Sequence, residues 1–241
     1  MSFSKSLLLG VSLIAFSPLT SFAGPAQFMG DAELKNQTFQ EAVTSMGRLK
    51  IEKSKLAQSL TSMGDADIKD SELQDGTFNG KTEVEKSTFT GSFTSNGDTE
   101  LESVSITKQT TINGNTKIKK STFGDTVTAS GEFDAEDSTF KAIIAEVEKM
   151  ELSNCKAESI LIKKSTDATK QQIVELKGKT DITGSITFES GNGKVVIKDK
   201  TVKTGEIKGV ATSAPAAAKT TPADTKPASA ENTTANPAKG Q

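Results

Sequence analysis

The chain has 241 residues, of which 34% are hydrophobic and 5% aromatic, and it contains no His, Trp or Tyr and a single Cys. Without His, no Ser-His-Asp or Cys-His catalytic set and no His-containing zinc site can form, and one Cys excludes an intrachain disulfide and an all-Cys zinc site. The formal net charge of −2 gives no basic field for nucleic acid. We therefore expect a non-enzymatic protein that uses no cofactor and binds no nucleic acid.

Residues 1–23 have the pattern of a secretory signal peptide. Lys5 is the only charge before an apolar run over residues 7–16, and Ser21 and Ala23 place small residues at −3 and −1 of a cleavage site before Gly24. The apolar run is too short to span a bilayer as a helix. The sequence predicts export to the periplasm, cell surface or extracellular medium, and a mature chain without a transmembrane segment.

Residues 24–210 carry a repeat of about 17 residues. Counted from a glycine at position 0, positions 4 and 9 are apolar and position 7 is mostly Ser in seven successive copies. The glycines are Gly30, Gly47, Gly64, Gly80, Gly97, Gly114 and Gly131. An eighth copy without the glycine places Cys155 in the Ser column, which predicts a buried thiol rather than a nucleophile.

The spacing within each repeat predicts three short strands. Apolar residues alternate with polar ones around positions 2 to 4 and 7 to 9, which is strand spacing, and the three-residue step from 4 to 7 predicts a corner. No Pro lies between Ala26 and Ala214, so strand pairing is uninterrupted. We expect an all-β fold, a single-stack parallel β-solenoid of about ten coils, spaced at about 4.8 Å, with a roughly triangular section.

Two segments depart from the repeat. The register slips after Lys164, which predicts a loop or insertion near residues 165–172 before two longer coils. Residues 211–241 contain four Pro and no Val, Ile, Leu or Phe. Such a segment cannot bury enough surface to offset its ordering entropy, so we expect a disordered C-terminal tail rich in Ala, Thr, Pro and Lys.

The first strand of each repeat carries charges that mostly alternate in sign from one coil to the next. Four carboxylates on two neighbouring coils break this alternation: Glu83, Glu85, Glu100 and Glu102. Oxygen-rich clusters of this kind suit a hard cation such as Ca²⁺, which gives the hypothesis of a weak cation site. The alternative interpretation is a solvated acidic patch.

The third strand carries no charge in six successive repeats and presents a column of threonines. The column consists of Thr44, Thr61, Thr77, Thr94, Thr111 and Thr128. Thr suits strands and packs as cross-strand ladders, which is the structural interpretation. Natural proteins usually charge flat strand faces to prevent association, so the absence of charge also predicts lateral association or binding to a regular surface.

The repeat length and the Thr-Gly turns of residues 180–186 and 201–207 resemble those of bactofilins, the polymer-forming bacterial cytoskeletal proteins. That resemblance implies end-to-end polymerisation without a nucleotide. The threonine column is similar to those of solenoidal ice-binding proteins, and the repeat also resembles the solenoids of secreted adhesins.

The sequence as a whole predicts an exported, non-enzymatic β-solenoid with a structural or adhesin-like surface role in the cell envelope. Its expected partners are further copies of itself or an envelope or surface component. Two alternatives stay open: a self-assembling, bactofilin-like polymer outside the cytoplasm, and binding of ice or a crystalline surface through the threonine column.

Overall fold

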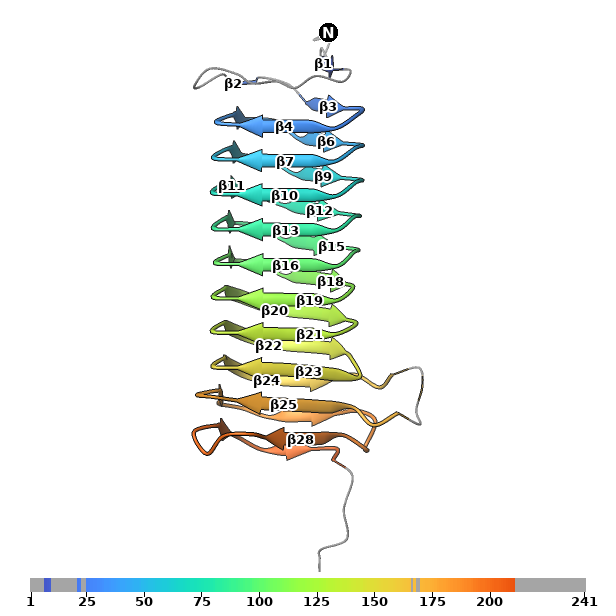
Figure 1. Ribbon diagram of the computed structural model, residues 1–241, viewed down its shortest axis with the longest axis vertical. Coiled ribbons are helices and arrows are strands. Elements are labelled where there is room, and N and C mark those ends of the chain that lie inside the picture. The colour runs from blue at the N-terminus through green and yellow to red at the C-terminus, as the bar shows by residue number, and fades with distance from the viewer. Residues whose placement is uncertain (1–6, 10–20, 23–24, 166, 168–169, 211–241) are drawn as a thin grey trace, which may run out of the picture. The chain divides into compact units, whose positions relative to one another are not determined.

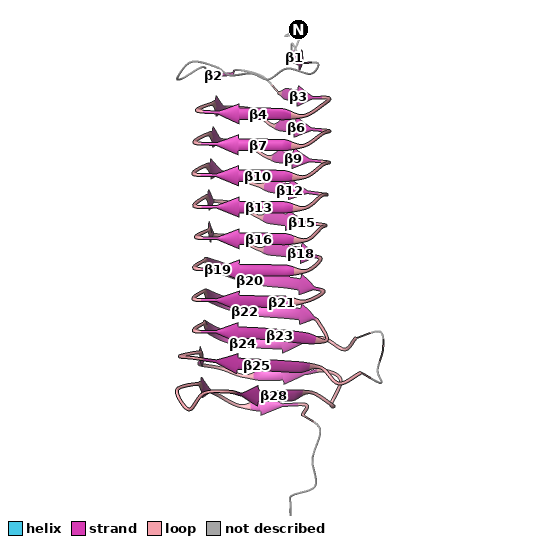
Figure 2. Cartoon of the chain, in the orientation of Figure 1, coloured by secondary structure: helices cyan, strands magenta, loops and turns pink. Residues whose placement is uncertain are grey.

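The computed structural model describes residues 7–9, 21–22, 25–165, 167 and 170–210. All regular secondary structure in these residues is β-strand, and the strands pair in parallel from coil to coil (Figures 1 and 2). The predicted parallel β-solenoid is therefore confirmed. The predicted tail, residues 211–241, lies outside the described residues.

Each coil contributes one strand to each of three faces, which gives the triangular section. The charged face is a ten-stranded sheet, one strand per coil, so the expectation of about ten coils is confirmed. Its strands are β4 (Ala32–Lys35), β7 (Leu49–Glu52), β10 (Ala66–Lys69), β13 (Thr82–Glu85), β16 (Thr99–Glu102), β19 (Thr116–Lys119), β21 (Phe133–Glu136), β23 (Lys149–Ser153), β25 (Ile173–Lys177) and β28 (Lys194–Ile197).

The second face and the threonine face belong to one continuous sheet, because three long strands turn the corner between them. These long strands are β20 (Thr122–Ser130), β22 (Thr139–Glu146) and β24 (Lys156–Ile162). The other strands of the second face are β2 (Ser21–Phe22), β5 (Thr38–Phe39), β8 (Lys55–Leu56), β11 (Glu72–Leu73), β14 (Thr88–Phe89), β17 (Ser105–Ile106), β26 (Asp181–Ile182) and β29 (Lys203–Thr204). Those of the threonine face are β1 (Leu7–Leu9), β3 (Ala26–Phe28), β6 (Val43–Ser45), β9 (Leu60–Ser62), β12 (Gly76–Phe78), β15 (Phe93–Ser95), β18 (Thr110–Asn113), β27 (Ile186–Phe188) and β30 (Ile207–Lys208).

Two strands from the segment interpreted as a signal peptide pair with the first coil. β1 pairs with β3, with Leu7 opposite Ala26, and β2 pairs with β5, with Ser21 opposite Thr38. In the uncleaved chain these strands lie on the N-terminal edge of the solenoid. Cleavage and export remain predictions, because pairing does not bear on them.

The glycine column exists because successive coils approach closely at one corner. A Cβ built on Gly97 would lie 2.5 Å from the carbonyl oxygen of Gly80, and one on Gly114 would lie 2.6 Å from that of Gly97. No side chain fits at such distances. The repeated glycines therefore follow from backbone stacking, and Gly131, with a φ of 98°, also adopts a backbone conformation that favours glycine.

The predicted corner after position 4 is a single residue in the left-handed conformation. Its φ lies between 48° and 58° in eight successive coils, at Asn36, Lys53, Asp70, Lys86, Ser103, Lys120, Asp137 and Asn154. This conformation disfavours L-residues other than Asn and Asp. The surrounding stack must therefore hold the lysines in place.

A column of buried serines stabilises this corner. The Ser54 hydroxyl accepts a hydrogen bond from the Gln37 N–H at 3.1 Å and donates one to the Glu52 carbonyl at 2.9 Å. The same arrangement recurs at Ser71, Ser87, Ser121 and Ser138, with Val104 in place of a serine in one coil, so each hydroxyl joins one coil to the next. This column satisfies backbone groups that the corner would otherwise bury without partners.

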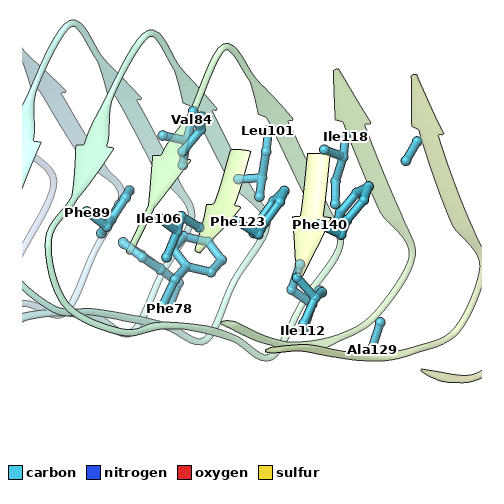
Figure 3. Packing of buried hydrophobic residues seen from close by; sticks show 14 of the residues in the cluster. Phe78, Val84, Phe89, Leu101, Ile106, Ile112, Ile118, Phe123, Ala129 and Phe140 are labelled. Atoms are coloured by element: carbon cyan, nitrogen blue, oxygen red, sulfur yellow. The ribbon is translucent and has the colours of Figure 1, made fainter. Parts of the chain in front are cut away.

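The core is a narrow stack of apolar side chains inside the three faces (Figure 3). Phe89 lies edge-on to Phe93 with ring centroids 5.2 Å apart, and Phe123 stacks on Phe140 at 5.0 Å. In the coil with one residue fewer, Gly76 occupies the place of Leu60 and Phe93, and Phe78 occupies that of Ser62 and Ser95. The Phe78 ring fills the space that Gly76 leaves, since a Cβ there would lie 2.6 Å from it.

Candidate functional site: the threonine face

The structure brings the six predicted threonines into one ladder. Thr61 lies opposite Thr44 and Thr77, Thr94 lies opposite Thr77 and Thr111, and Thr128 completes the row. Thr77 is exposed and the others are half-buried. The shorter coil keeps the register, so neighbouring rungs are spaced at about 4.8 Å throughout.

The ladder continues past Thr128 with apolar residues that sequence counting missed. Ile144 lies opposite Thr128, and Leu161 lies opposite Ile144, both half-buried. A register shift between Phe123 and Thr126 moves Ile143 into the core in place of Ile144. The shift arises because only Lys141 separates Phe140 from Ala142, whereas two residues separate Phe123 from Thr126.

The column beside the threonines is irregular and contains a charge, which corrects the expectation of an uncharged face. Asp75 precedes β12 and lies level with Ser59 and Ser92, because this coil is one residue short. Its Oδ1 accepts hydrogen bonds from the Ser92 N–H at 2.7 Å and the Ser92 hydroxyl at 2.8 Å. These bonds lower the pKa of the Asp75 carboxyl, so it stays ionised. Only the threonine column itself is uniform.

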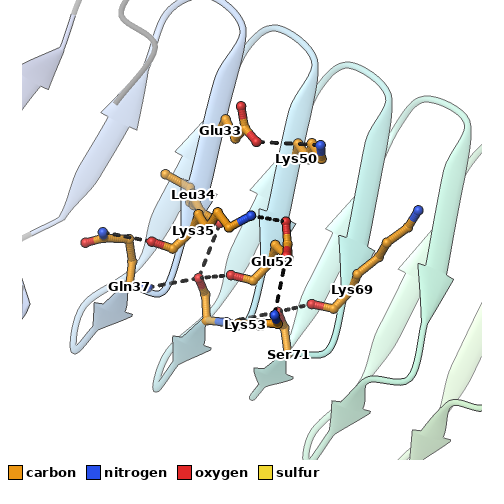
Figure 4. A network of polar contacts seen from close by, with 10 residues as sticks. Glu33, Leu34, Lys35, Gln37, Lys50, Glu52, Lys53, Lys69 and Ser71 are labelled. Carbon is orange, nitrogen blue, oxygen red and sulfur yellow. Dashed lines mark hydrogen bonds and ion pairs between the residues drawn. The ribbon is translucent and has the colours of Figure 1, made fainter. Parts of the chain in front are cut away.

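The charged face is neutralised by pairs between adjacent coils. The Lys35 Nζ lies 2.9 Å from the Glu52 carboxylate, and the Lys50 Nζ lies 3.5 Å from that of Glu33 (Figure 4). The Lys35 hydrogen bond lowers the pKa of Glu52 and raises that of Lys35. Exposed pairs contribute little stability, so this face favours solubility more than binding.

The four glutamates of the proposed cation site do lie together. Glu83 is opposite Glu100 and Glu85 is opposite Glu102, around a shallow depression of about 180 Å³. Lys69, Lys117 and Lys119 also line it and supply opposite charge. No group of three or more acidic or Cys side chains among the described residues is arranged to hold a metal ion. The cation site stays a prediction without a preformed geometry.

Cys155 lies in the serine column, as predicted, and is fully buried. Its Sγ is 3.4 Å from the Ala135 carbonyl oxygen and 3.3 Å from that of Ser153, so the thiol replaces a serine hydroxyl. Burial raises the pKa of this thiol to about 11. Since the thiolate is the nucleophile, Cys155 is unreactive near neutral pH.

No protein-family model, curated protein or solved structure matches this chain. Within the described part of the chain, no helix is long and apolar enough to cross a membrane. The fold and the threonine ladder are therefore the basis for a functional argument.

Proposed function

We propose that this chain is an exported, non-enzymatic structural solenoid that uses its threonine face to contact an extended surface in the cell envelope. The observation that supports this proposal is the ladder of six threonines in register. It offers hydroxyl groups at a constant spacing of about 4.8 Å without a formal charge on the column. A glycan layer, which presents hydroxyl and amide groups at regular intervals, is the complementary surface.

Co-sedimentation with purified peptidoglycan sacculi tests this proposal. Thr61→Lys with Thr94→Lys places two charges in the middle of the ladder and should lower the bound fraction at least about tenfold. The matched control is Thr122→Lys with Thr139→Lys, which adds the same charge at exposed, paired threonines on the second face. A parent chain that stays in the supernatant, or equal losses in both double variants, would contradict the proposal. Turnover of the glycan would contradict its non-enzymatic part.

End-to-end self-assembly, as in bactofilins, is the second candidate, and the last coil favours it. β28 pairs with β25 on one side only among the described strands, and Ile197 and Val210 are 51% and 39% exposed. An open strand edge beside apolar surface is a template for another chain. Filaments in negative-stain micrographs that Ile197→Lys abolishes would support this candidate, and a monomer at high concentration would eliminate it.

Ice binding is the weaker alternative, since the column beside the threonines varies in size and includes Asp75. A flat ice-binding face needs a uniform surface on both columns. Thermal hysteresis of the parent chain measures this directly, and its absence would remove the alternative.

A further inference from the structure

Three exposed methionines form a column at the corner between the threonine face and the charged face. Met29, Met46 and Met63 are the residues just before the glycine in three successive coils, and they are 56%, 50% and 50% exposed. The chain has five Met, of which one is Met1 and another, Met150, is fully buried. The remaining three all stand in this one column.

The fold does not require an apolar residue at this corner. In the next three coils the same place is taken by Asn79, Asn96 and Asn113, whose side-chain amides bond to one another at 2.8 and 2.9 Å. The Asn79 amide also donates to the Met63 sulfur at 3.3 Å, which joins the two halves of the column. Half-exposed methionines add little burial, so what they add beyond asparagine is a row of thioether sulfurs.

The spacing of the row suits a soft monovalent metal ion. Backbone bonds from the Met46 N–H to the Phe28 carbonyl and from the Met63 N–H to the Ser45 carbonyl, both 2.8 Å, place the three residues on adjacent rungs. Rungs are about 4.8 Å apart. A bond from sulfur to the d¹⁰ ion Zn²⁺ is roughly 2.3 Å long. Two bonds of that length, from one ion to sulfurs on adjacent rungs, would nearly bridge the spacing between the rungs.

We propose that Met29, Met46 and Met63 form a binding site for a soft monovalent cation, Cu(I) or Ag(I), held by thioether sulfurs from adjacent coils. Thioethers select soft ions such as Cu(I) over hard ones such as Ca²⁺ or Mg²⁺. Met46 is the central ligand, because it has a sulfur-bearing neighbour on both sides. Met29 and Met63 are two rungs apart, roughly twice 4.8 Å, and cannot both reach one ion without it.

Titration of the full chain with Ag(I) against a chromogenic competitor tests this site. All variants carry Cys155→Ser, so that the thiol does not bind silver. We expect one Ag(I) per parent chain, a loss of affinity of at least about tenfold in Met46→Leu, and a smaller loss in Met29→Leu, which leaves an adjacent pair. Leu keeps the apolar surface and removes only the sulfur, so a protein-docking role would not respond to it.

Two results would overturn the proposal. One is a Cys155→Ser parent chain that binds no Ag(I) below millimolar concentration. The other is equal affinity in the parent, Met29→Leu and Met46→Leu chains, which would place the ion elsewhere. Circular dichroism of each variant checks that it is folded, and Ca²⁺ in place of Ag(I) should give no saturable binding that depends on these methionines.

Discussion

The interior coils and the last coil use the same pattern of apolar residues but bury it to different degrees. In the interior, Leu101 and Ile118 are 1% and 0% exposed. In the last coil Ile197, on the equivalent strand, is 51% exposed, and Val202 and Ile207 are only partly buried. An inward side chain is covered by the coils before and after it, and the described chain continues no further. Burial is thus a property of the stack rather than of one coil.

Phe89→Ala in the interior and Ile207→Ala in the last coil should give the largest difference in lost stability between these regions. Phe89 is fully buried and packs against Phe78 and Phe93. Its truncation leaves a cavity and should lower the free energy of unfolding by about 3–5 kcal/mol. Ile207→Ala in the last coil should cost about 1 kcal/mol, because its site is already partly open. Chemical denaturation measures both, and similar losses would show that the last coil is covered.

Gly97→Ala tests the close approach of backbones in the interior. The added methyl meets the Gly80 carbonyl at 2.5 Å, so the coil must shift, at a cost of about 1–3 kcal/mol. Gly191 near the last coil has a φ of 72° and open space around its Cβ. Gly191→Asn, which tolerates that φ, should be nearly neutral. Thermal melts compare the two, and a tolerated Gly97→Ala would contradict the stacking argument.

Ser87→Ala tests the serine column. The Ser87 hydroxyl accepts from the Ser71 N–H at 3.1 Å and donates to the Glu85 carbonyl at 2.8 Å. Its loss leaves a buried N–H unpaired and should cost about 1–3 kcal/mol. Thr201→Ala in the last coil removes an exposed hydrogen bond to the Gly178 carbonyl and should cost less, because water replaces it. Equal losses in urea denaturation would show that the buried serine contributes no more than an exposed hydrogen bond.

Thr110→Val should stabilise the interior by about 1 kcal/mol. Thr110 is fully buried in a column whose other members, such as Leu60, Phe93 and Val127, are mostly apolar, and its hydroxyl has no hydrogen-bond partner among the described residues. Val has the same shape without the polar atom. The control is Thr111→Val, on the outside of the same strand, which should change little. A destabilised Thr110→Val protein would mean that the hydroxyl has a partner, such as a buried water.

The difference in the free energy of unfolding between Cys155→Ser and the parent chain should change with pH only at high pH. The thiol pKa rises from 9.0 to about 11 on folding, so between these values the folded chain keeps a proton that the unfolded chain has lost. The free energy of unfolding of the parent therefore falls as pH rises through this range. Cys155→Ser lacks this contribution, so the difference between the two proteins should be flat up to pH 8 and change above pH 9. A difference that is constant to pH 11 would contradict the burial of the thiol.

The sequence could predict the solenoid because the fold repeats its constraints. Most coils supply a glycine at the close corner, a small hydroxyl at the second corner and apolar residues between, so the columns around Gly97 and Ser87 can be recognised in the sequence. The packing of the shorter coil was harder to predict from the sequence. Phe78 takes the place of a serine and fills the space beside Gly76, which depends on packing between coils, and the level of Asp75 follows from the missing residue in this coil. Met29, Met46 and Met63 repeat at the same 17-residue spacing, but only the structure shows that their side chains are exposed on adjacent rungs.

Hydrogen exchange, resolved by coil at low protein concentration, tests the stack most directly. The threonine ladder and the methionine column depend on coils that protect one another, and end-to-end assembly depends on an open C-terminal edge. We expect amides of the interior coils, such as those of β13 and β16, to exchange only with global unfolding, and those of β28 and β30 to exchange fastest among the strands. Uniform protection through β30 would contradict an open edge and indicate that another chain covers it. Fast exchange in β13 or β16 would contradict the stack itself.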